Sequence, residues 1–458
     1  MKAYWDNGPV QLYHADARNI PLPDQSVHCV VTSPPYFGLR VYQDNDDRGI
    51  GLEASIEAYI ANLVDVFREV RRVLRDDGVL WLNLGDSYAS IGRSERKESP
   101  GVGATQAMES IDRDVVWQAG GGHNFNWSLP GGHKAGDRLG IPERVVLALQ
   151  ADGWIWRDTI IWAKKSAMPE SLAGWRWERC RVKVGALADR THETNHRDYS
   201  SHLSDTPSNE WTDCLGCPKC AENDGLVLRR GSWRTTQAHE YIYMLTKCMG
   251  YHADGEAVKT AAIHAGRLVK ATGNGAKNSG HINNTADGFT HHDTLVGSGA
   301  NRRSVWNDIS PEPYGGSHFA TFPSDLPRIC IQASTSERGC CSECGSQWAR
   351  VVDTGPQGTY NENGNPQGIN RSTMAWGDDH PSNNPRWHNT NSTLGWRPTC
   401  NCNAPAIPAT VLDPFSGTAT TCRAAQKLGR RAVGVDISEA YLEQAVRRLS
   451  AVTLPMDI

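Results

Sequence analysis

The sequence predicts an α/β protein built on a doubly wound, Rossmann-like sheet. Two strand–helix–strand patterns, one near each end of the 458-residue chain, indicate this class. A helical crossover between neighbouring strands makes them parallel, so each pattern contributes parallel strands. Long polar stretches rich in glycine and cysteine separate the two patterns. We therefore expect one core assembled from both ends of the chain, with large irregular insertions.

The N-terminal pattern begins with a short β-branched strand over residues 27–32. Apolar residues then recur at three- and four-residue steps over residues 53–74, which predicts an amphipathic helix. A second strand is expected over residues 79–84, followed by a helix over residues 142–150 and a strand over residues 155–162. From Lys164 to about Arg303 the periodicity is weak, and this stretch predicts no regular element.

The C-terminal pattern occupies the last sixty or so residues. A strand over residues 410–412 enters the turn Asp-Pro-Phe-Ser-Gly-Thr, and a helix follows over residues 419–428. A second strand over residues 431–435 ends at Asp436, and a final helix begins after Ser438, a typical N-cap residue. The predicted elements again alternate between strand and helix.

Composition excludes some classes of function. The mean hydropathy is −0.52, and no stretch approaches the ~20 apolar residues of a membrane span. With no membrane partner and no signal peptide evident, we expect a soluble, cytoplasmic protein. The net charge of −4 excludes a basic coat over the whole chain. Residues 157–303 carry 20 basic and 16 acidic residues, which makes the middle the better place for an anionic partner.

The C-terminal turn has features of a nucleoside-binding loop. Asp436 lies 23 positions after Asp413, close to the ~20 at which a carboxylate takes ribose hydroxyls. Gly417 permits close approach to the backbone at a helix N-terminus. The glycine spacing is not G-x-G-x-x-G, so a cofactor with ribose and no pyrophosphate fits better. The alternative is an ordinary strand–helix unit with a tight turn.

The N-terminal strand ends in Thr32-Ser33-Pro34-Pro35-Tyr36. Two prolines force an extended exit and leave carbonyls without ladder partners. A hydroxyl, a carbonyl and an aromatic ring would project together from the carboxyl end of the strand, where open α/β sheets place ligands. The alternative is a strand that is simply terminated by prolines.

Together the two motifs resemble those of the DNA amino-methyltransferases, which use S-adenosylmethionine. Here Ser-Pro-Pro-Tyr precedes Asp-Pro-Phe-x-Gly, which is similar to the permuted beta class of that family. The resemblance continues in residues 79–88, 154–164 and 318–323. It implies a methyltransferase sheet, flipping of a base out of double-stranded DNA, and direct attack by the exocyclic amine on the methyl group.

The resemblance also implies residue roles. Ser33, Pro34, Pro35 and Tyr36 would form the catalytic motif: the serine hydroxyl and the first proline's carbonyl would bind the amine, and the tyrosine ring would stack on the base. Residues implied to contact the cofactor are Asp16, Phe319, Thr321, Phe322, Asp413, Phe415, Gly417, Thr418 and Asp436.

The target base is predicted from the same motif. Ser-Pro-Pro-Tyr is more typical of enzymes that methylate cytosine N4, and adenine N6 is the alternative. Methylation of cytosine C5 is disfavoured because it needs a thiolate after a proline, and the sequence has no Pro-Cys pair.

Target recognition is assigned to residues 165–305, where basic and aromatic residues mix. We expect Arg229, Arg230, Trp233 and Arg234 to contact DNA, with a solvated basic loop face as the alternative. Trp162 matches an aromatic position beside the extruded base; a core tryptophan is the alternative.

Eight of the 13 cysteines form two sets with metal-ligand spacing. One set comprises Cys341, Cys344, Cys400 and Cys402, with Cys340 as a substitute. The other comprises Cys214, Cys217 and Cys220, with Cys180 as the favoured fourth ligand and His192, His196 or His239 as alternatives. We expect two structural zinc ions, one in each set; the alternative is reduced thiols without metal.

The predicted organisation has three parts. Residues 1–164 form the catalytic half with an inserted loop at 87–137, residues 165–305 recognise the target, and residues 306–458 form the cofactor half with a zinc-ribbon-like insert at 340–402. The resemblance implies a bacterial or phage-encoded, nucleoid-associated enzyme. A homodimer and a companion restriction nuclease stay open, and a catalytically inactive, zinc-stabilised DNA-binding protein is the rival function.

Overall fold

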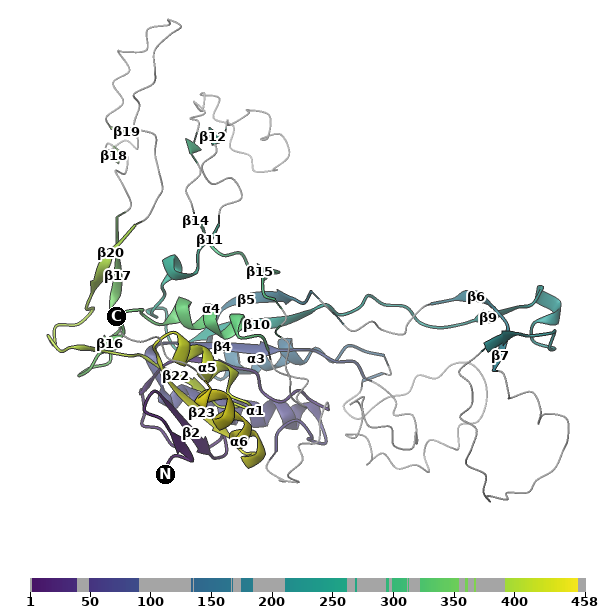
Figure 1. The fold of residues 1–458 in the computed structure, drawn as a ribbon, viewed down its shortest axis with the longest axis horizontal. Helices are drawn as coiled ribbons and strands as arrows, with labels where there is room; N and C mark the ends of the chain where they lie inside the picture. The colour runs from purple at the N-terminus through teal and green to yellow at the C-terminus, as the bar shows by residue number, and fades with distance from the viewer. Residues whose placement is uncertain are drawn as a thin grey trace, which may run out of the picture. The chain divides into compact units, whose positions relative to one another are not determined.

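The computed structural model (Figure 1) divides into two compact units. Unit 1 comprises residues 1–165 and 239–458, and unit 2 comprises residues 166–238. The structure describes residues 2–38, 49–89, 133–134, 136–165, 167, 174–183, 211–261, 268–269, 294–295, 299–310, 312, 322–353, 359–360, 366–367 and 392–451. Most of the predicted loop 87–137 lies outside these residues. No helix in the described ranges is long and apolar enough to cross a membrane.

Unit 1 is organised by a nine-stranded sheet that joins both ends of the chain. Figure 1 shows the purple N-terminal strand β2 beside the yellow C-terminal strand β23. In spatial order the strands are β1 (Trp5–Asp6), β2 (Val10–His14), β23 (Arg431–Asp436), β22 (Thr410–Asp413), β3 (Val27–Thr32), β4 (Leu74–Leu84), β10 (His239–Thr246), β5 (Ile155–Ala163) and β15 (Val305–Trp306).

The sheet is mixed, whereas the strand–helix–strand patterns predicted a parallel sheet. Strands β23, β22, β3 and β4 are parallel, as predicted, and β2, which was not predicted, is parallel to β23. Strand β10 is antiparallel to both β4 and β5. It falls within residues 164–303, where weak periodicity had predicted no regular element. The chain passes from β5 into β10 through unit 2 and returns at the same edge of the sheet, so the two strands must run in opposite directions.

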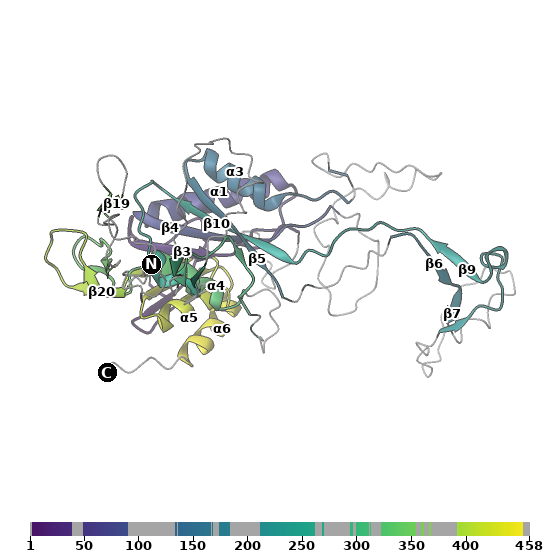
Figure 2. The same cartoon turned by 90° about the horizontal axis from the view of Figure 1, so that it is seen from above.

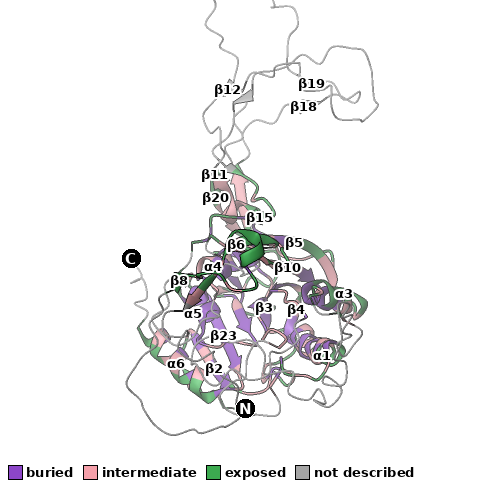
Figure 3. Ribbon diagram, turned by 90° about the vertical axis from the view of Figure 1, so that its right-hand side faces the viewer, coloured by how far each residue is buried: buried purple, intermediate pink, exposed green. Residues whose placement is uncertain are grey.

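Helices cover both faces of the sheet (Figure 2). Helices α1 (Ile56–Val73) and α3 (Ile141–Ala151) pack with the sheet in a first core cluster. Helices α4 (Asp325–Ser334), α5 (Thr420–Lys427) and α6 (Glu439–Ser450) pack in a second core cluster on the other face. Strand β3 is buried on both sides, so its residues alternate between the clusters: Val30 belongs to the first and Val31 to the second. Figure 3 shows the central strands as buried.

The predicted helices are present with small shifts at their ends. Ser55 caps α1, because its side chain accepts a hydrogen bond from the backbone N–H of Ala58. The helix ends at Val73 and leads directly into β4, which starts five residues before the predicted strand. Helix α4 was not predicted.

Strands β3 and β22 are neighbours at the point where the sheet changes its winding. Strand β3 leads to α1 on one face, and β22 leads to α5 on the other. They are parallel, with Val30 opposite Leu412, so both strands end at the same edge. In open α/β sheets, ligands bind outside the carboxyl ends of strands at such a switch point.

Unit 2 has little core of its own. It consists of the paired strands β6 (Arg176–Arg179) and β9 (Leu226–Arg229), the pair β7 (Arg181–Lys183) and β8 (Trp211–Asp213), and the 3-10 helix η1 (Ala221–Asn223). Cys220 is the one buried residue among those described in this unit. Hydrophobic burial therefore contributes little to its stability.

Unit 1 carries further short elements outside the main sheet. They are the 3-10 helix η2 (Gly255–Val258) and the strand pairs β11 (Thr260–Ala261) with β14 (Gly299–Ala300), β12 (Leu268–Val269) with β13 (Thr294–Leu295), β16 (Cys340–Cys341) with β21 (Ala406–Ile407), β17 (Ala349–Asp353) with β20 (Ser392–Arg397), and β18 (Thr359–Tyr360) with β19 (Pro366–Gln367).

Candidate active site

A buried hydrogen bond ties the two sequence motifs together. The hydroxyl of Thr32, at the end of β3, donates to Oδ1 of Asp413, at the end of β22, over 2.7 Å and across 381 positions of sequence. The backbone N–H of Phe415 donates to the same oxygen at 3.1 Å. Burial raises the pKa of Asp413 to about 6 against the opposing effect of these bonds. Asp413 therefore acts as a brace between the two loops.

Asp436 organises the glycine turn. Its Oδ2 accepts from the backbone N–H of Gly417 at 2.7 Å, and its Oδ1 accepts from that of Ser438 at 2.9 Å. The backbone N–H of Ile437 also donates to this carboxylate. An ionised carboxylate has about four acceptor sites, so one stays available. Burial raises the pKa of Asp436 to about 6, although these three backbone bonds oppose the shift.

Gly417 leaves open space beside the turn. Its φ is +48°, and a Cβ added there would meet nothing within 4 Å among the described residues. Both the carbonyl and the hydroxyl of the neighbouring Thr418 accept from Nη1 of Arg448 on α6. Thr418 therefore anchors α6 to this turn.

Asp16 and Phe415 flank this turn. Asp16 follows β2, whose last residue His14 lies opposite Asp436. Its carboxylate pairs with Arg18 at 2.7 Å. The partly buried Phe415 packs against the first core cluster, as does Tyr36. The two predicted aromatic positions therefore share one side of the sheet.

The Ser-Pro-Pro-Tyr loop is held from several sides. The hydroxyl of Tyr59, on α1, donates to the Pro35 carbonyl at 2.8 Å. The ring of Tyr36 lies against Gly85 so closely that a Cβ there would stand 2.7 Å from its Cε2. The Ser33 side chain hydrogen-bonds with Tyr36, while burial and the nearby Glu240 raise the pKa of Tyr36 well above its usual value.

Three residues around Tyr36 were not predicted from the sequence. The tyrosine hydroxyl donates to Oε2 of Glu240 at 2.8 Å and lies 3.5 Å from Oδ1 of Asn83. The ammonium of Lys164 pairs with Oε1 of the same glutamate. Asn83 lies in the predicted strand 79–84 and Lys164 follows the predicted strand 155–162, whereas Glu240 is the second residue of the unpredicted strand β10. A polar residue at the carboxyl end of a predicted strand was the available signal for Asn83 and Lys164, and Glu240 had none.

Comparison with known proteins identifies the family. The family model described as DNA methylase (N6_N4_Mtase) matches residues 27–342 and 408–447. The chain belongs to this family. It is therefore a DNA amino-methyltransferase, with the permuted motif order that the sequence predicted.

Curated relatives cover most of the chain. The methylase is 33% identical over 329 residues to the Type II methyltransferase M.Cfr9I of Citrobacter freundii, an alignment spanning 71% of this chain and 72% of the relative. It is 33% identical over 318 residues to M.SmaI of Serratia marcescens, spanning 69% and 72%.

Solved structures are more distant. The PvuII DNA methyltransferase, described as cytosine-N4-specific, shares 11% identity with a TM-score of 0.45, covering 99% of this chain and 91% of that one. A DNA modification methylase of Thermus thermophilus, complexed with S-adenosyl-L-methionine, shares 17% identity with a TM-score of 0.40, covering 96% and 92%.

Four further predicted residues of the methylase have different outcomes. Phe319 and Thr321 lie outside the described residues. Phe322 is partly buried and packs against the second core cluster. Trp162 is only 8% exposed within that cluster, with the Lys164 ammonium 5.2 Å from its ring centroid. Because the ring is enclosed by core side chains, the prediction that Trp162 contacts an extruded base gives way to a packing role.

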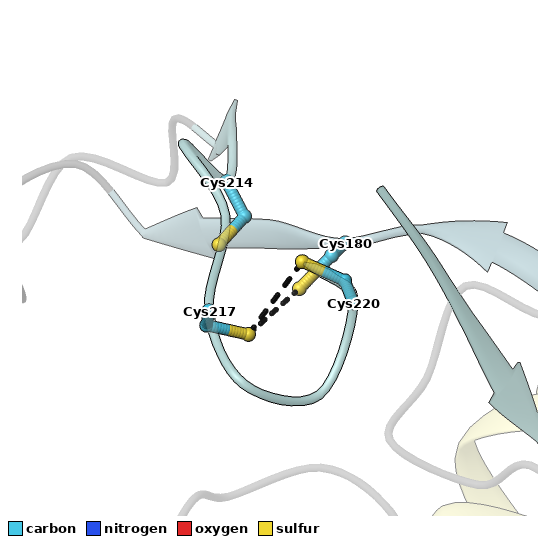
Figure 4. Close-up of side chains that lie close together, drawn as sticks. All are labelled: Cys180, Cys214, Cys217 and Cys220. Atoms are coloured by element: carbon cyan, nitrogen blue, oxygen red, sulfur yellow. Dashed lines mark hydrogen bonds between the residues drawn. The ribbon is translucent and has the colours of Figure 1, made fainter. Parts of the chain in front are cut away.

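Both predicted cysteine sets converge. In each set of four the Sγ atoms all lie within 4.8 Å of one another: Cys180, Cys214, Cys217 and Cys220 in unit 2, and Cys341, Cys344, Cys400 and Cys402 in unit 1. Figure 4 shows the first set, where the Cys217 sulfur lies 3.8 Å from that of Cys180 and 3.6 Å from that of Cys220.

The alternatives for these sets fare differently. The thiol of Cys340 points to the Ile407 carbonyl at 3.5 Å and stays outside its set. His239 lies 3.3 Å from the Tyr241 hydroxyl and is not one of the four converging residues. His192 and His196 lie outside the described residues.

The cysteine set of unit 1 contacts the sheet at the edge opposite the active site. The Arg75 guanidinium donates to the Cys344 carbonyl at 2.9 Å. His28 lies 2.9 Å from the Gly345 carbonyl through Nε2, and its Nδ1 accepts from the backbone N–H of Thr410 at 3.0 Å. This set therefore braces the amino ends of β3, β4 and β22. Hydrogen bonds from Ser346 lower the pKa of the Cys344 thiol to about 6.

The predicted DNA-contacting residues of unit 2 lie on its surface. Arg229 lies 3.4 Å from Glu178, and the Arg230 guanidinium lies 5.0 Å from the Trp175 ring centroid. Trp233 is 71% exposed. Arg234 is partly buried. The other exposed tryptophans of the unit are Trp175, Trp177 and Trp211.

Proposed function

We propose that this methylase transfers a methyl group from S-adenosylmethionine to the N4 amine of cytosine at a specific site in double-stranded DNA. The observation that carries the proposal is the hydrogen bond from Thr32 to Asp413. It sets the Ser-Pro-Pro-Tyr loop beside the Asp436 turn, so an amine held by one and a cofactor held by the other would meet.

The cofactor side fits a nucleoside with a free ribose diol. Asp436 keeps an acceptor site for a ribose hydroxyl, and the open space at Gly417 admits a ligand against the backbone. When bound, S-adenosylmethionine supplies the activated methyl group. We assign Phe415 to the adenosine and methionine portion and Asp16 to the adenine side.

The amine side works by orientation and hydrogen bonding. The lone pair of an exocyclic amine is delocalised into its ring, which makes the nitrogen a poor nucleophile. The Ser33 hydroxyl and the Pro34 carbonyl would accept one N–H each and localise that lone pair as the nitrogen becomes tetrahedral. The Tyr36 ring would stack on the base. Because the amine lies within a base stack, the base must first be flipped out.

The choice of cytosine rests on the motif, because Ser-Pro-Pro-Tyr is more typical of enzymes that methylate cytosine N4. Adenine N6 is the alternative. Site specificity is supported by the relatives M.Cfr9I and M.SmaI, both named Type II methyltransferases. We assign target recognition to the exposed arginines and tryptophans of unit 2, because guanidinium groups and aromatic rings suit phosphates and base edges.

We further propose that each cysteine set binds a structural Zn²⁺ ion. Four converging sulfurs are the donor set that tetrahedral zinc prefers, and neither set keeps an open position for catalysis. In unit 2, where Cys220 alone is buried among the described residues, a metal would supply folding free energy that packing does not.

Methyl transfer and analysis of the modified nucleosides test the proposal. Tritium from labelled S-adenosylmethionine should enter mixed-sequence DNA, and digestion should yield N4-methylcytosine. N6-methyladenine would overturn the choice of base. Absence of label would overturn the proposed activity and favour an inactive DNA-binding protein.

A matched pair of serine variants tests the catalytic loop. Ser33→Ala should lower kcat about a hundredfold while cofactor affinity holds, because the Ser33 hydroxyl would contact the amine and bonds to Tyr36, and neither contact involves the cofactor turn. Ser26→Ala removes a serine at the other end of β3, where its hydroxyl donates to the exposed Pro23 carbonyl. It should leave kcat unchanged. Equal losses of kcat and cofactor affinity in Ser33→Ala would contradict the assigned role.

A further inference from the structure

Two charged residues sit where the chain leaves the sheet for unit 2 and where it returns. Strand β5 ends at Ala163 and is followed by Lys164, while β10 starts at His239 and is followed inward by Glu240. The strands pair with His239 opposite Ala163. Lys164 and Glu240 therefore lie together on the stem of the inserted unit, at the same edge as the Ser-Pro-Pro-Tyr loop.

Both carboxylate oxygens of Glu240 are engaged. Oε1 binds the Lys164 ammonium, and Oε2 accepts the Tyr36 hydroxyl at 2.8 Å. The glutamate side chain is 12% exposed and that of the lysine 33%. Burying a carboxylate costs free energy unless a cation and hydrogen-bond donors compensate. Here one donor is the Tyr36 hydroxyl, so the ion pair of Lys164 and Glu240 and the Tyr36 side chain stabilise each other's positions.

The tyrosine ring has little freedom between its contacts. Gly85 touches one part of the ring, at the Cε2 atom, and Glu240 holds the hydroxyl at the far end. A ring that stacks on a flipped base must present one face at a fixed angle, and small misplacements of such groups reduce turnover strongly. Packing against glycine alone would let the ring tilt, whereas a hydrogen bond at the hydroxyl fixes its orientation.

We propose that Glu240, held by Lys164, is a positioning residue that orients Tyr36 for stacking on the flipped base. This inference rests on the proposed function. It adds two residues from the stem of unit 2 to the machinery of methyl transfer, and it assigns the hydroxyl of Tyr36 to orientation rather than to the reacting atoms.

Single-turnover methylation by the full chain tests the inference. Glu240→Gln keeps the size of the side chain but loses its charge, and Lys164→Met removes the cation. Each should lower the single-turnover rate about tenfold, in keeping with loss of a charge-assisted hydrogen bond. The affinity for S-adenosylmethionine should stay within about twofold of wild type, because the proposed cofactor turn at Gly417 follows a different strand, β22. Lys165→Met, one residue along and bonded to Ser310 at 3.3 Å, is the matched control and should keep the wild-type rate.

A double-mutant cycle separates positioning from general destabilisation. Tyr36→Phe should lower the rate at least as much as Glu240→Gln, because it also removes the contacts of the hydroxyl with Ser33 and Asn83. The double variant should be no slower than Tyr36→Phe, since the contact between Tyr36 and Glu240 is already lost in that single variant. Multiplying rate losses would refute the inference. So would wild-type rates in both Glu240→Gln and Lys164→Met with the wild type active. A wild type that never methylates DNA would instead refute the proposed function.

Discussion

Cofactor binding should weaken in acid because Asp436 must be ionised to accept the ribose hydroxyls. Burial raises the pKa of this carboxyl to about 6 from 3.8. With that pKa about nine-tenths of the protein is ionised at pH 7 and about one-tenth at pH 5. The Kd for S-adenosylmethionine should therefore rise about tenfold between these values. Isothermal titration calorimetry from pH 5 to pH 8 measures the change directly.

The contribution of Asp436 to folding stability has the opposite pH dependence, so protonation of this carboxyl does not itself favour unfolding. The folded-state pKa of Asp436 lies above its unfolded value, so the folded protein binds the proton more tightly. The resulting stabilisation is fully present below pH 3.8 and is lost as the pH rises through about 6. At pH 5 this carboxyl therefore favours the fold while it disfavours the cofactor.

Asp436→Asn is the decisive variant, since Asp413 also has a pKa raised to about 6. Asparagine cannot titrate, so the variant should bind the cofactor more weakly at pH 7 and lose the tenfold change. If the variant keeps the wild-type pH dependence, the titration belongs to Asp413, and the ribose role of Asp436 is refuted.

Two further variants test other parts of the structure. Gly85→Ala should lower kcat at least about tenfold with unchanged cofactor affinity, because the new Cβ would stand 2.7 Å from Cε2 of Tyr36 and must displace the ring; wild-type kcat would show that the ring is not held there. Cys217→Ser should lower the zinc content by one ion per chain, measured by mass spectrometry, and weaken DNA binding while cofactor affinity holds; unchanged zinc, or iron in its place, would contradict the proposed site.

The sequence predicted the strands of the active site because their signals are local. Residues 27–32 form a β-branched run that prolines terminate, and residues 410–413 run into a turn with glycine. Helices such as α1 are predicted from apolar residues that recur at three- and four-residue steps. Such patterns depend only on residues that are close in sequence, so they can be recognised without knowledge of the tertiary structure.

Strand β10 escaped prediction for a physical reason. Its residues, His-Glu-Tyr-Ile-Tyr-Met-Leu-Thr, mix polar and aromatic side chains, and they follow a long irregular stretch. What makes them a strand is pairing with β4 on one side and β5 on the other, which is a tertiary effect. Because strand β10 was not predicted, the contact of Glu240 with Tyr36 was not predicted either.

Trp162 marks a different limit of prediction. An aromatic residue near the end of a strand can stack on a ligand or fill a core, and the sequence alone leaves both open. The choice is decided by what covers the ring, here the side chains of the second core cluster. The cysteine sets were easier, because short spacings such as Cys-x-x-Cys already place two sulfurs together; only Cys180, far from its partners in sequence, needed the fold to join them.

The order of the motifs along the chain is unimportant to the site, and the topology explains why. The chemistry requires only that β3 and β22 be neighbours whose following helices cross to opposite faces of the sheet. Thr32 and Asp413 satisfy that condition across 381 positions with one buried hydrogen bond. The chain between these two residues can therefore contain long insertions, provided that each insertion leaves and rejoins the sheet at fixed strands. Unit 2 does so between β5 and β10, and the cysteine set of unit 1 does so at the amino ends of the central strands. The two insertions are thus attached at opposite edges of the sheet. In the part of the chain that the structure describes, Glu240, at the attachment of unit 2, contacts Tyr36 and pairs with Lys164.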